Sequence, residues 1–293
     1  MDKLSNNLNN WEPLKSKPVN TGLKIYSEIL GEQIEVPDNP ERIVSLAPAI
    51  TDTIYALGAS DRLVGVSVFC DKPLEARNKP KVGTYYKVNY KLLEQLQPDL
   101  VLVTTGAQRG RINELREKGY TVVPIPLPTN LYDIMSNTLM IGVVVNALEQ
   151  ARKLTRKMMS AIHDLTAEYT RGTVYYEVDL GGPTSAGGIT YIDHALRTLG
   201  LENIFGDERI TWIINPDPAE IARRNPDYII YEPKPYSKYT IQGILEALRQ
   251  RGLGATKAIK ENRVVILEPN SLAHYGPAII DTLKEIRHKV ENL

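Results

Sequence analysis

The sequence predicts an α/β protein built from two similar lobes joined by one long helix. Two β-branched and aromatic runs, at 42–48 (RIVSLAP) and 173–179 (TVYYEVD), each lead into an amphipathic stretch that ends in Leu-Gly. A Pro-Asp pair precedes an apolar run in each half, beginning at Pro98 and at Pro226. Because strands and helices alternate in both halves, we expect two parallel sheets covered by helices, with a ligand cleft between them.

The first half reads as a hairpin followed by alternating strands and helices. Residues 23–36 alternate about Gly31 and predict a β-hairpin, which a Pro-Asp-Asn-Pro turn at 37–40 closes. After it we expect strand 42–46, a helix from an N-cap at Thr51 to Leu57, strand 62–68, helix 89–96 capped by Asn89, strand 100–104, helix 108–118 and strand 120–125.

A long helical pattern separates the two halves. Residues 131–170 contain no proline and a single glycine, Gly142, and apolar residues recur at helical spacing from Leu148 to Leu165. This pattern predicts one helix over about 144–169. Such a connector differs from a flexible Gly/Ser linker and predicts lobes held at a nearly fixed separation.

The second half repeats the alternation. Here we expect strand 173–179, a glycine-rich turn at 181–188, helix 189–199, a loop through Trp212, helix 218–224, strand 227–232, helix 240–250, strand 263–267 and helix 277–291. The predicted organisation is a disordered polar tether over 1–22, an N-terminal lobe over 23–143, a connecting helix over 144–170 and a C-terminal lobe over 171–293.

Composition excludes several classes of protein. The 35 basic and 35 acidic residues cancel, which removes the electrostatic basis for binding nucleic acid. The single cysteine, Cys70, excludes an intramolecular disulfide and a cysteine-cluster metal site. No apolar run is long enough to span a membrane. The 16 tyrosines suit a wet binding surface, although a preference of the lineage for Tyr over Phe explains them equally well.

The N-terminal tract is polar and rich in asparagine, and it lacks the apolar core of a signal peptide. It therefore fits two alternatives. One is a cytoplasmic protein with a frayed N-terminus, and the other is an exported protein whose signal or anchor has been removed.

Known catalytic motifs do not match. The glycine-rich turn at 181–188 follows a strand and precedes a helix, as anion-binding turns do, but it fits neither GxGxxG nor GxxxxGK[ST]. It is better interpreted as a close-approach turn lining a cleft. There is no GxSxG or HExxH sequence, and Cys70 lacks a neighbouring histidine motif. These observations favour binding over catalysis.

Candidate ligand contacts lie at the carboxyl ends of the predicted strands, where open α/β sheets bind ligands. These positions hold Ala47 to Ala49, Phe69 and Cys70, Thr105 and Gly106, Asp179 and Leu180, and Glu232 with Tyr236, and loops nearby hold Tyr85, Tyr86 and Trp212. One aromatic ring from each lobe would clamp a flat, bulky ligand. The alternative is that these loop aromatics only cover the edges of the core.

Three stretches together carry a resemblance to a known family: PERIVSLAPAITDTIYALGASDRLVGVS, VGTYYKVNYKLLEQLQPDLVL, and LGLENIFGD followed by NPDYII. The chain resembles, over about 30–291, the class III substrate-binding proteins of ABC importers for cobalamin, iron–siderophores and haem, and most of all the cobalamin-binding branch. The resemblance implies two Rossmann-like lobes joined by a helix, and an extracytoplasmic, monomeric carrier with no enzymatic activity or cofactor. Its partners would be a corrinoid or ferric chelate and a permease dimer.

The resemblance also implies roles for individual residues. Phe69, Tyr85 and Trp212 match cleft aromatics, and the loop from Ser45 to Ala49 would face the corrin. The complete predicted ligand site is Pro48, Ala49, Phe69, Tyr85, Tyr86, Ser185, Trp212, Glu232 and His274. His274 stands where many relatives have an arginine, so it would either ligate cobalt or iron or serve as an ordinary loop histidine.

The permease-docking positions depart from the family pattern. Lys91 and Ala219 stand where the family carries a glutamate in each lobe, and Glu94 and Glu220 lie close by. We expect these two neighbours to substitute in docking. Three alternatives to a corrinoid carrier stay open: a carrier of ferric siderophore, haem or an oxyanion, an enzyme acting on a tetrapyrrole or metal, and a scaffold without a ligand.

Overall fold

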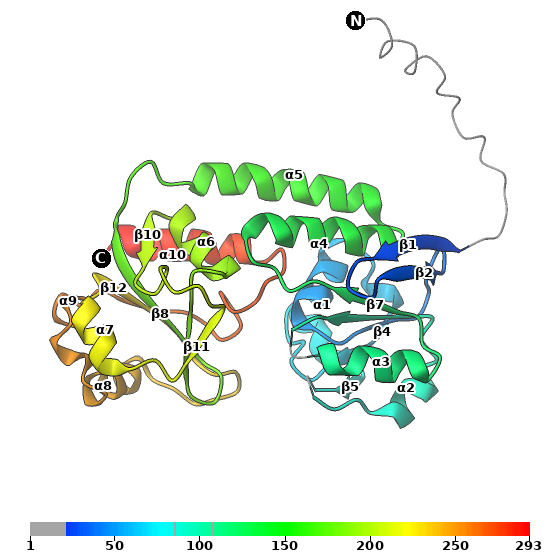
Figure 1. Cartoon of the computed structure of the whole chain (residues 1–293), viewed down its shortest axis with the longest axis horizontal. Coiled ribbons are helices and arrows are strands. Elements are labelled where there is room, and N and C mark those ends of the chain that lie inside the picture. Colours follow the sequence, from blue (N-terminus) through cyan, green and yellow to red (C-terminus); the bar gives the residue numbers. More distant parts are fainter. Residues whose placement is uncertain (1–21, 85, 107) are drawn as a thin grey trace, which may run out of the picture.

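The computed structural model describes residues 22–84, 86–106 and 108–293, and it shows two α/β lobes bridged along one side by helices (Figure 1). The N-terminal lobe contains β1 (Leu23–Ser27), β2 (Glu32–Val36), β3 (Ile43–Ser45), α1 (Pro48–Ala56), β4 (Leu63–Ser67), β5 (Lys81–Gly83), α2 (Tyr90–Leu96), β6 (Leu100–Thr104), α3 (Arg109–Glu117) and β7 (Val122–Ile125). The bridging helices are α4 (Leu131–Val144) and α5 (Leu148–Leu165). The C-terminal lobe contains β8 (Gly172–Asp179), β9 (Pro183–Ala186), α6 (Tyr191–Thr198), β10 (Leu201–Asn203), β11 (Trp212–Ile214), α7 (Pro218–Arg224), β12 (Tyr228–Glu232), α8 (Ile241–Gln250), α9 (Lys257–Lys260), β13 (Val264–Ile266) and α10 (Ile279–Glu291).

The N-terminal sheet is parallel throughout, in the order β5-β4-β3-β6-β7, as predicted. All residues of β3 and β6 are buried, because helices cover both faces of the sheet. One predicted boundary is wrong. Helix α1 starts at Pro48 rather than after Thr51, because proline suits the first helical turn, and the Thr51 hydroxyl instead donates to Ser45 Oγ (2.8 Å) inside the core.

The C-terminal lobe has the predicted α/β architecture, but its sheet is mixed. The order is β11-β9-β8-β12-β13, with β10 beside the start of β8. Strand β9 runs antiparallel to β8, and β11 runs antiparallel to β9. Both lie in segments that the sequence analysis assigned to a turn and a loop. The chain can fold back tightly because Gly181 adopts a left-handed φ of 103° and Asp179 Oδ1 accepts the N–H groups of Gly181 (2.8 Å) and Gly182 (3.0 Å).

Two helices, and not one, connect the lobes. Asn146 has a φ of 51°, which ends the helical pattern before α5 begins at Leu148 and separates it from α4. The connecting helix α5 is therefore shorter than the predicted 144–170. A Cβ on Gly142 would lie 2.4 Å from Ala151 Cβ, so this glycine lets α4 and α5 pack closely. No helix in the described part of the chain is long and apolar enough to cross a membrane.

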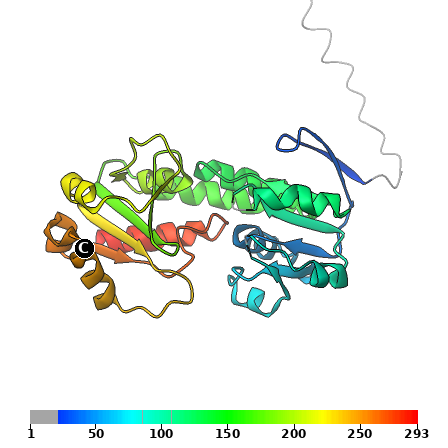
Figure 2. The same ribbon diagram turned by 60° about the horizontal axis from the view of Figure 1, so that its bottom comes forward.

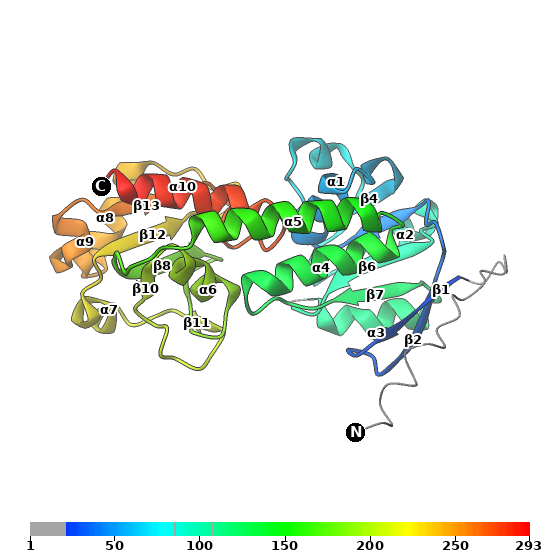
Figure 3. The ribbon, with the colours of Figure 1, turned by 90° about the horizontal axis from the view of Figure 1, so that it is seen from above.

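Helix α5 belongs to the cores of both lobes, and Figure 3 shows it running along the two of them. Ala151 packs in the core of the N-terminal lobe, and Met158 and Ile162 pack in the core of the C-terminal lobe. Leu154 contacts both cores. Because each end is buried in a different lobe, the helix limits their relative movement.

The lobes also meet directly through residues 270–278, the loop before α10, which reaches toward the N-terminal lobe (Figure 2). We call the contacts of this loop with the N-terminal lobe the interlobe junction. At its centre, Asp52 Oδ2 accepts the backbone N–H of Ala278 (3.0 Å) and lies 3.2 Å from His274 Nε2. The other hydrogen bonds join Tyr275 OH to Thr104 Oγ1 (3.2 Å), Lys72 Nζ to Asn270 O (2.9 Å) and Asn270 Nδ2 to Asp71 Oδ1 (3.2 Å).

Replacing Asp52 tests the contribution of this junction. Asp52→Ala leaves the Ala278 N–H and the buried His274 ring without their acceptor, so we expect the free energy of unfolding to fall by about 1–3 kcal/mol. Urea denaturation followed by circular dichroism measures this change. The control is Asp38→Ala, which removes an exposed carboxylate. Equal stability of the two variants would contradict the assignment.

Candidate functional site

A pocket of about 390 Å³ lies between the two lobes at the carboxyl ends of the strands. We call it the interlobe pocket. Its lining comprises Tyr86 from the N-terminal lobe and Leu180, Gly181, Gly182, Thr184, Trp212, Ile214 and Asn215 from the C-terminal lobe. Tyr86 and Trp212 are distant in sequence and belong to different lobes, yet they line the same space. An aromatic residue from each lobe is the arrangement that the sequence analysis predicted for a ligand clamp.

The wall on the C-terminal lobe is built by the antiparallel strands β9 and β11 and the turns beside them. Trp212 pairs with Ala186 across β11 and β9, and the indole packs partly against the core of its lobe. Ile214 and Leu180 are 74% and 61% exposed. Exposed apolar side chains grouped at a pocket mark a binding surface, because a ligand that covers them removes apolar area from water and lowers the free energy. The wall therefore favours a ligand with an apolar face.

The N-terminal lobe contributes the turn that carries Tyr86, whose side chain is 72% exposed. Thr84 fixes this turn, since its Oγ1 accepts the N–H groups of Tyr86 (3.2 Å) and Lys87 (3.1 Å), and its own N–H donates to Lys87 O (2.8 Å). A short, hydrogen-bonded turn limits the entropy that Tyr86 loses when it binds a ligand. Tyr85, the other aromatic residue predicted here, lies outside the described residues.

A second hollow of about 340 Å³ adjoins the interlobe pocket and shares Gly181 and Gly182 with it. We call it the polar pocket. Its remaining lining residues are Glu177, Asp179, Pro183, Tyr231, Lys234 and Arg251. Arg251 binds Glu177 through two hydrogen bonds of 2.6 and 2.8 Å. Burial and the nearby carboxylates of Glu177 and Asp179 raise the pKa of Tyr231 to about 12, so its hydroxyl stays protonated.

Three predicted ligand residues are buried and hydrogen-bonded to other parts of the protein. Ser185 is fully buried and donates to Tyr176 O (2.6 Å), and it occupies the side of β9 that faces the core. His274 is 4% exposed and engages Asp52 in the interlobe junction. Its Nε2 would have to leave that carboxylate before it could ligate a metal.

Glu232 is the third, with 1% exposure. Its carboxylate accepts the backbone N–H groups of Ser271 (3.0 Å), Leu272 (2.9 Å) and Ala273 (2.9 Å), and the hydroxyl of Tyr176 (3.1 Å). Burial raises the pKa of Glu232, and these hydrogen bonds oppose that effect. The residue therefore fixes the start of the loop that forms the interlobe junction.

The remaining predicted residues of the N-terminal lobe lie outside the lining of the interlobe pocket. Pro48 begins α1 and is half-buried, and Ala49 is 6% exposed. A Cβ on Gly276 would lie 3.1 Å from Ala49 O, so Ala49 sits against the interlobe junction. Phe69 is half-buried just after β4.

Thr184, Ile214 and Asn215 line the interlobe pocket but were not predicted. Thr184 and Ile214 face each other across β9 and β11. Neither strand is evident from the sequence, so no periodicity indicates where these side chains point. The one available signal was the pair of isoleucines after Trp212, which suits a strand.

The two glutamates expected to dock onto the permease differ in whether their carboxylates are already paired with a cation. Glu94 is exposed on α2. Glu220, on α7, accepts hydrogen bonds from Arg223 (2.6 and 2.7 Å) and Arg224 (2.6 Å) of its own helix. These guanidinium groups lower the pKa of Glu220 to about 2. Its charge is therefore already paired, whereas in the described part of the chain Glu94 makes no ion pair.

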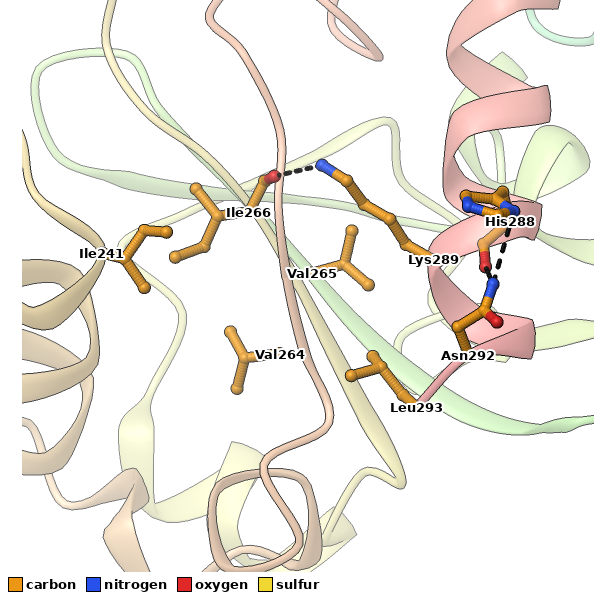
Figure 4. A pocket seen from close by; sticks show the side chains of 8 residues that line it. All are labelled: Ile241, Val264, Val265, Ile266, His288, Lys289, Asn292 and Leu293. Atoms are coloured by element: carbon orange, nitrogen blue, oxygen red, sulfur yellow. Dashed lines mark hydrogen bonds between the residues drawn. The ribbon is translucent and has the colours of Figure 1, made fainter.

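Another hollow lies at the free edge of β13 in the C-terminal lobe, beside the end of α10 (Figure 4). Its lining is mainly aliphatic, with Ile241, Val264, Ile266 and Leu293 among its residues. Lys289 Nζ donates to Ile266 O (2.9 Å), which satisfies a carbonyl on the edge of the sheet and discourages pairing with another chain. Because its lining comes from one lobe and holds no aromatic ring other than His288, this hollow lacks the clamp found between the lobes.

A substitution of Glu232 distinguishes a role in folding from a role in ligand contact. In Glu232→Gln the side-chain amide cannot accept at both former oxygen positions, so at least one buried N–H loses its partner, and the free energy of unfolding should fall by about 1–3 kcal/mol. Chemical denaturation measures this loss, with exposed Glu268→Gln as the matched control. Undiminished stability would show that the carboxylate is not needed to hold the loop.

Comparison with known proteins agrees with the geometry. A family model described as "Periplasmic binding protein" matches residues 43–271. The chain is 27% identical over 271 residues to the uncharacterized ABC transporter substrate-binding lipoprotein YvrC of Bacillus subtilis (strain 168), covering 88% of this chain and 82% of the relative. It is 26% identical over 194 residues to a vitamin B12-binding protein of Yersinia pestis (strain Pestoides F), covering 65% of this chain and 69% of the relative.

Solved structures share the fold. The vitamin B12 binding protein BtuF of Vibrio cholerae has a TM-score of 0.74 at 20% identity and covers 87% of this chain and 98% of its own. The heme-binding protein RhuT of Roseiflexus sp. RS-1 also has a TM-score of 0.74, at 22% identity, and covers 86% and 98%. The predicted fold class and the resemblance to substrate-binding proteins of ABC importers are thereby confirmed. Since the family model matches most of its length, this chain belongs to the periplasmic binding protein family.

Proposed function

We propose that the protein is an extracytoplasmic carrier, periplasmic or tethered on the outer face of a membrane, that binds a corrinoid in the interlobe pocket and delivers it to an ABC importer. The observation that carries this proposal is a pair of aromatic residues, Tyr86 and Trp212, that come from different lobes and line one pocket. Relatives described as vitamin B12-binding proteins support the choice of a corrinoid.

The physical basis of binding is the burial of broad ligand faces. A corrin ring is large, rigid and mostly apolar on its two faces, so covering it with Trp212, Leu180 and Ile214 removes apolar surface from water on both partners. Aromatic rings supply this contact with little loss of rotamer entropy. The function requires no catalytic residue, because the ligand leaves the carrier unchanged.

The site is largely formed before the ligand arrives. Helix α5 is buried in both lobes, and the interlobe junction ties Asp52 to the start of α10. Closing the lobes widely would break these contacts. We therefore expect a small hinge movement on binding, which keeps the cost of ordering low.

Haem or a ferric siderophore is the second candidate ligand, because a heme-binding protein shares this fold. In the parts of the chain that the structure describes, no three His, Cys, Asp or Glu side chains gather as a metal site. A metal would therefore arrive inside its own chelator, and the carrier would recognise the organic surface. A corrinoid would be recognised in the same way, through its organic surface.

Tryptophan fluorescence tests the proposal directly. The chain has two tryptophans, Trp11 and Trp212, so Trp11→Phe leaves Trp212 as the single reporter. Cyanocobalamin should quench this emission in a saturable manner, because the corrin absorbs light close to the indole. Binding of haemin or a ferric siderophore without any response to cobalamin would overturn the corrinoid assignment.

Substitution of Trp212 measures how much this side chain contributes to the free energy of ligand binding. Trp212→Ala should weaken binding of cyanocobalamin by about 1–3 kcal/mol, since it removes an anchor of the pocket wall. Isothermal titration calorimetry gives the affinity without an optical reporter. The matched control is Tyr169→Ala, which truncates an aromatic residue that is 67% exposed and absent from the pocket lining. An unchanged affinity in Trp212→Ala would remove this residue from the site.

Docking to the permease is proposed at Glu94 and Glu220. Glu220 is already paired with Arg223 and Arg224, so it gains less from an arginine of the permease than Glu94 does. Glu94→Ala should therefore weaken binding to the purified permease dimer by about 3- to 5-fold, and Glu220→Ala by less. Surface plasmon resonance compares both with Glu117→Ala, an exposed glutamate on α3. The reverse order of effects would contradict this ranking.

A further inference from the structure

The polar pocket continues the site that the interlobe pocket begins. Gly181 and Gly182 form the wall that the two hollows share, at the carboxyl end of β8. Neither glycine has a side chain to separate the two spaces. Lys234 Nζ lies 3.9 Å from the position that a Cβ on Gly181 would take, so the lysine extends along this wall. A ligand held between Tyr86 and Trp212 can therefore place one arm beside Lys234.

The polar pocket contains four charged side chains. Two of them, Glu177 and Arg251, form an ion pair, and the other two, Asp179 and Lys234, keep free hydrogen-bonding capacity. Glu177 and Arg251 neutralise each other through two hydrogen bonds, and the hydroxyl of Tyr175 donates to Glu177 Oε2 (2.5 Å). Asp179 Oδ1 accepts two backbone N–H groups of the β8–β9 turn, whereas its Oδ2 accepts no hydrogen bond from the described residues. Lys234 makes no ion pair within the described part of the chain. One cationic donor and one anionic acceptor thus remain to meet a ligand.

From this arrangement we infer that the polar pocket binds a neutral carboxamide arm of the ligand, with Lys234 donating to its carbonyl oxygen and Asp179 accepting from its NH₂ group. The inference rests on the proposed carrier function. A primary carboxamide both accepts and donates, so it satisfies both residues. A carboxylate offers no proton to Asp179 and repels it, and an ammonium group would be repelled by Lys234.

This subsite would separate classes of tetrapyrrole-like ligand. The periphery of a corrinoid carries carboxamide arms, whereas haem carries two carboxylates. Leaving the Asp179 carboxylate opposite another carboxylate costs affinity, because the ligand brings a like charge and no donor. The polar pocket would therefore favour corrinoids over haem, while the aromatic clamp accepts either flat ring.

The test compares cyanocobalamin with its monocarboxylates, in which one peripheral amide has been hydrolysed. Calorimetry at pH 7 on the unaltered protein should show the weakest monocarboxylate isomer binding about 10-fold less tightly than the amide. Asp179→Asn should reduce this difference to about 2-fold, because it removes the repelling charge and keeps an oxygen for the turn. Lys234→Met should weaken cyanocobalamin itself by about 5-fold. The control is Asp281→Asn, an exposed carboxylate on α10, which should change neither ligand.

The outcomes separate this inference from the proposed function. If the unaltered protein binds cyanocobalamin but Asp179→Asn and Lys234→Met bind both ligands as it does, the polar pocket does not contact the ligand and only the inference fails. If the unaltered protein binds no corrinoid, the proposed function and the inference fail together. Thermal melting of each variant shows that a loss of binding does not come from unfolding.

Discussion

The carboxylate of Asp52 is the interaction on which the arrangement of the lobes depends. It accepts the N–H of Ala278, the residue before α10, and contacts His274, so a side chain of one lobe holds the segment that leads into the final helix of the other. Gly276 makes this approach possible, since a Cβ there would lie 2.4 Å from Asp52 Oδ2. Glu232 holds the same loop from within its own lobe, through three backbone N–H groups. Two buried carboxylates thus fix one loop against both lobes.

This fixed contact explains how the pocket can carry exposed apolar side chains. Helix α5 and the interlobe junction keep the lobes in position, so the pocket does not need to close on itself to be stable. Tyr86, Leu180 and Ile214 can then remain open to solvent until a ligand covers them. Buried contacts outside the pocket keep the lobes rigid while apolar side chains inside the pocket stay exposed. A preformed site of this kind loses little free energy to ordering when a ligand binds, so more of the contact energy appears as affinity.

The two lobes contribute unequal chemistry. The N-terminal lobe supplies a single described residue to the interlobe pocket, Tyr86, whereas the antiparallel strands β9 and β11 and the turns beside them supply the rest of its described lining. Two strands that break the parallel pattern, together with the turns beside them, therefore build the C-terminal side of the pocket. The α/β plan is common to both lobes, whereas most of the pocket lining comes from the part of the fold that is not doubled.

The sequence by itself determined the repeated α/β plan and placed Tyr86 and Trp212 in loops of different lobes, because periodicity and turn residues act locally along the chain. It missed α4 and the antiparallel strands β9 and β11. Only the tertiary structure decided which strand-end residues line the interlobe pocket and which are buried. Glu232 and His274 stand at suitable places in the sequence but are buried against segments far away in the chain, and Ser185 is buried against the neighbouring strand β8. Whether a polar side chain meets a ligand or a backbone N–H depends on long-range packing, and hydrophobic patterning carries no information about that packing.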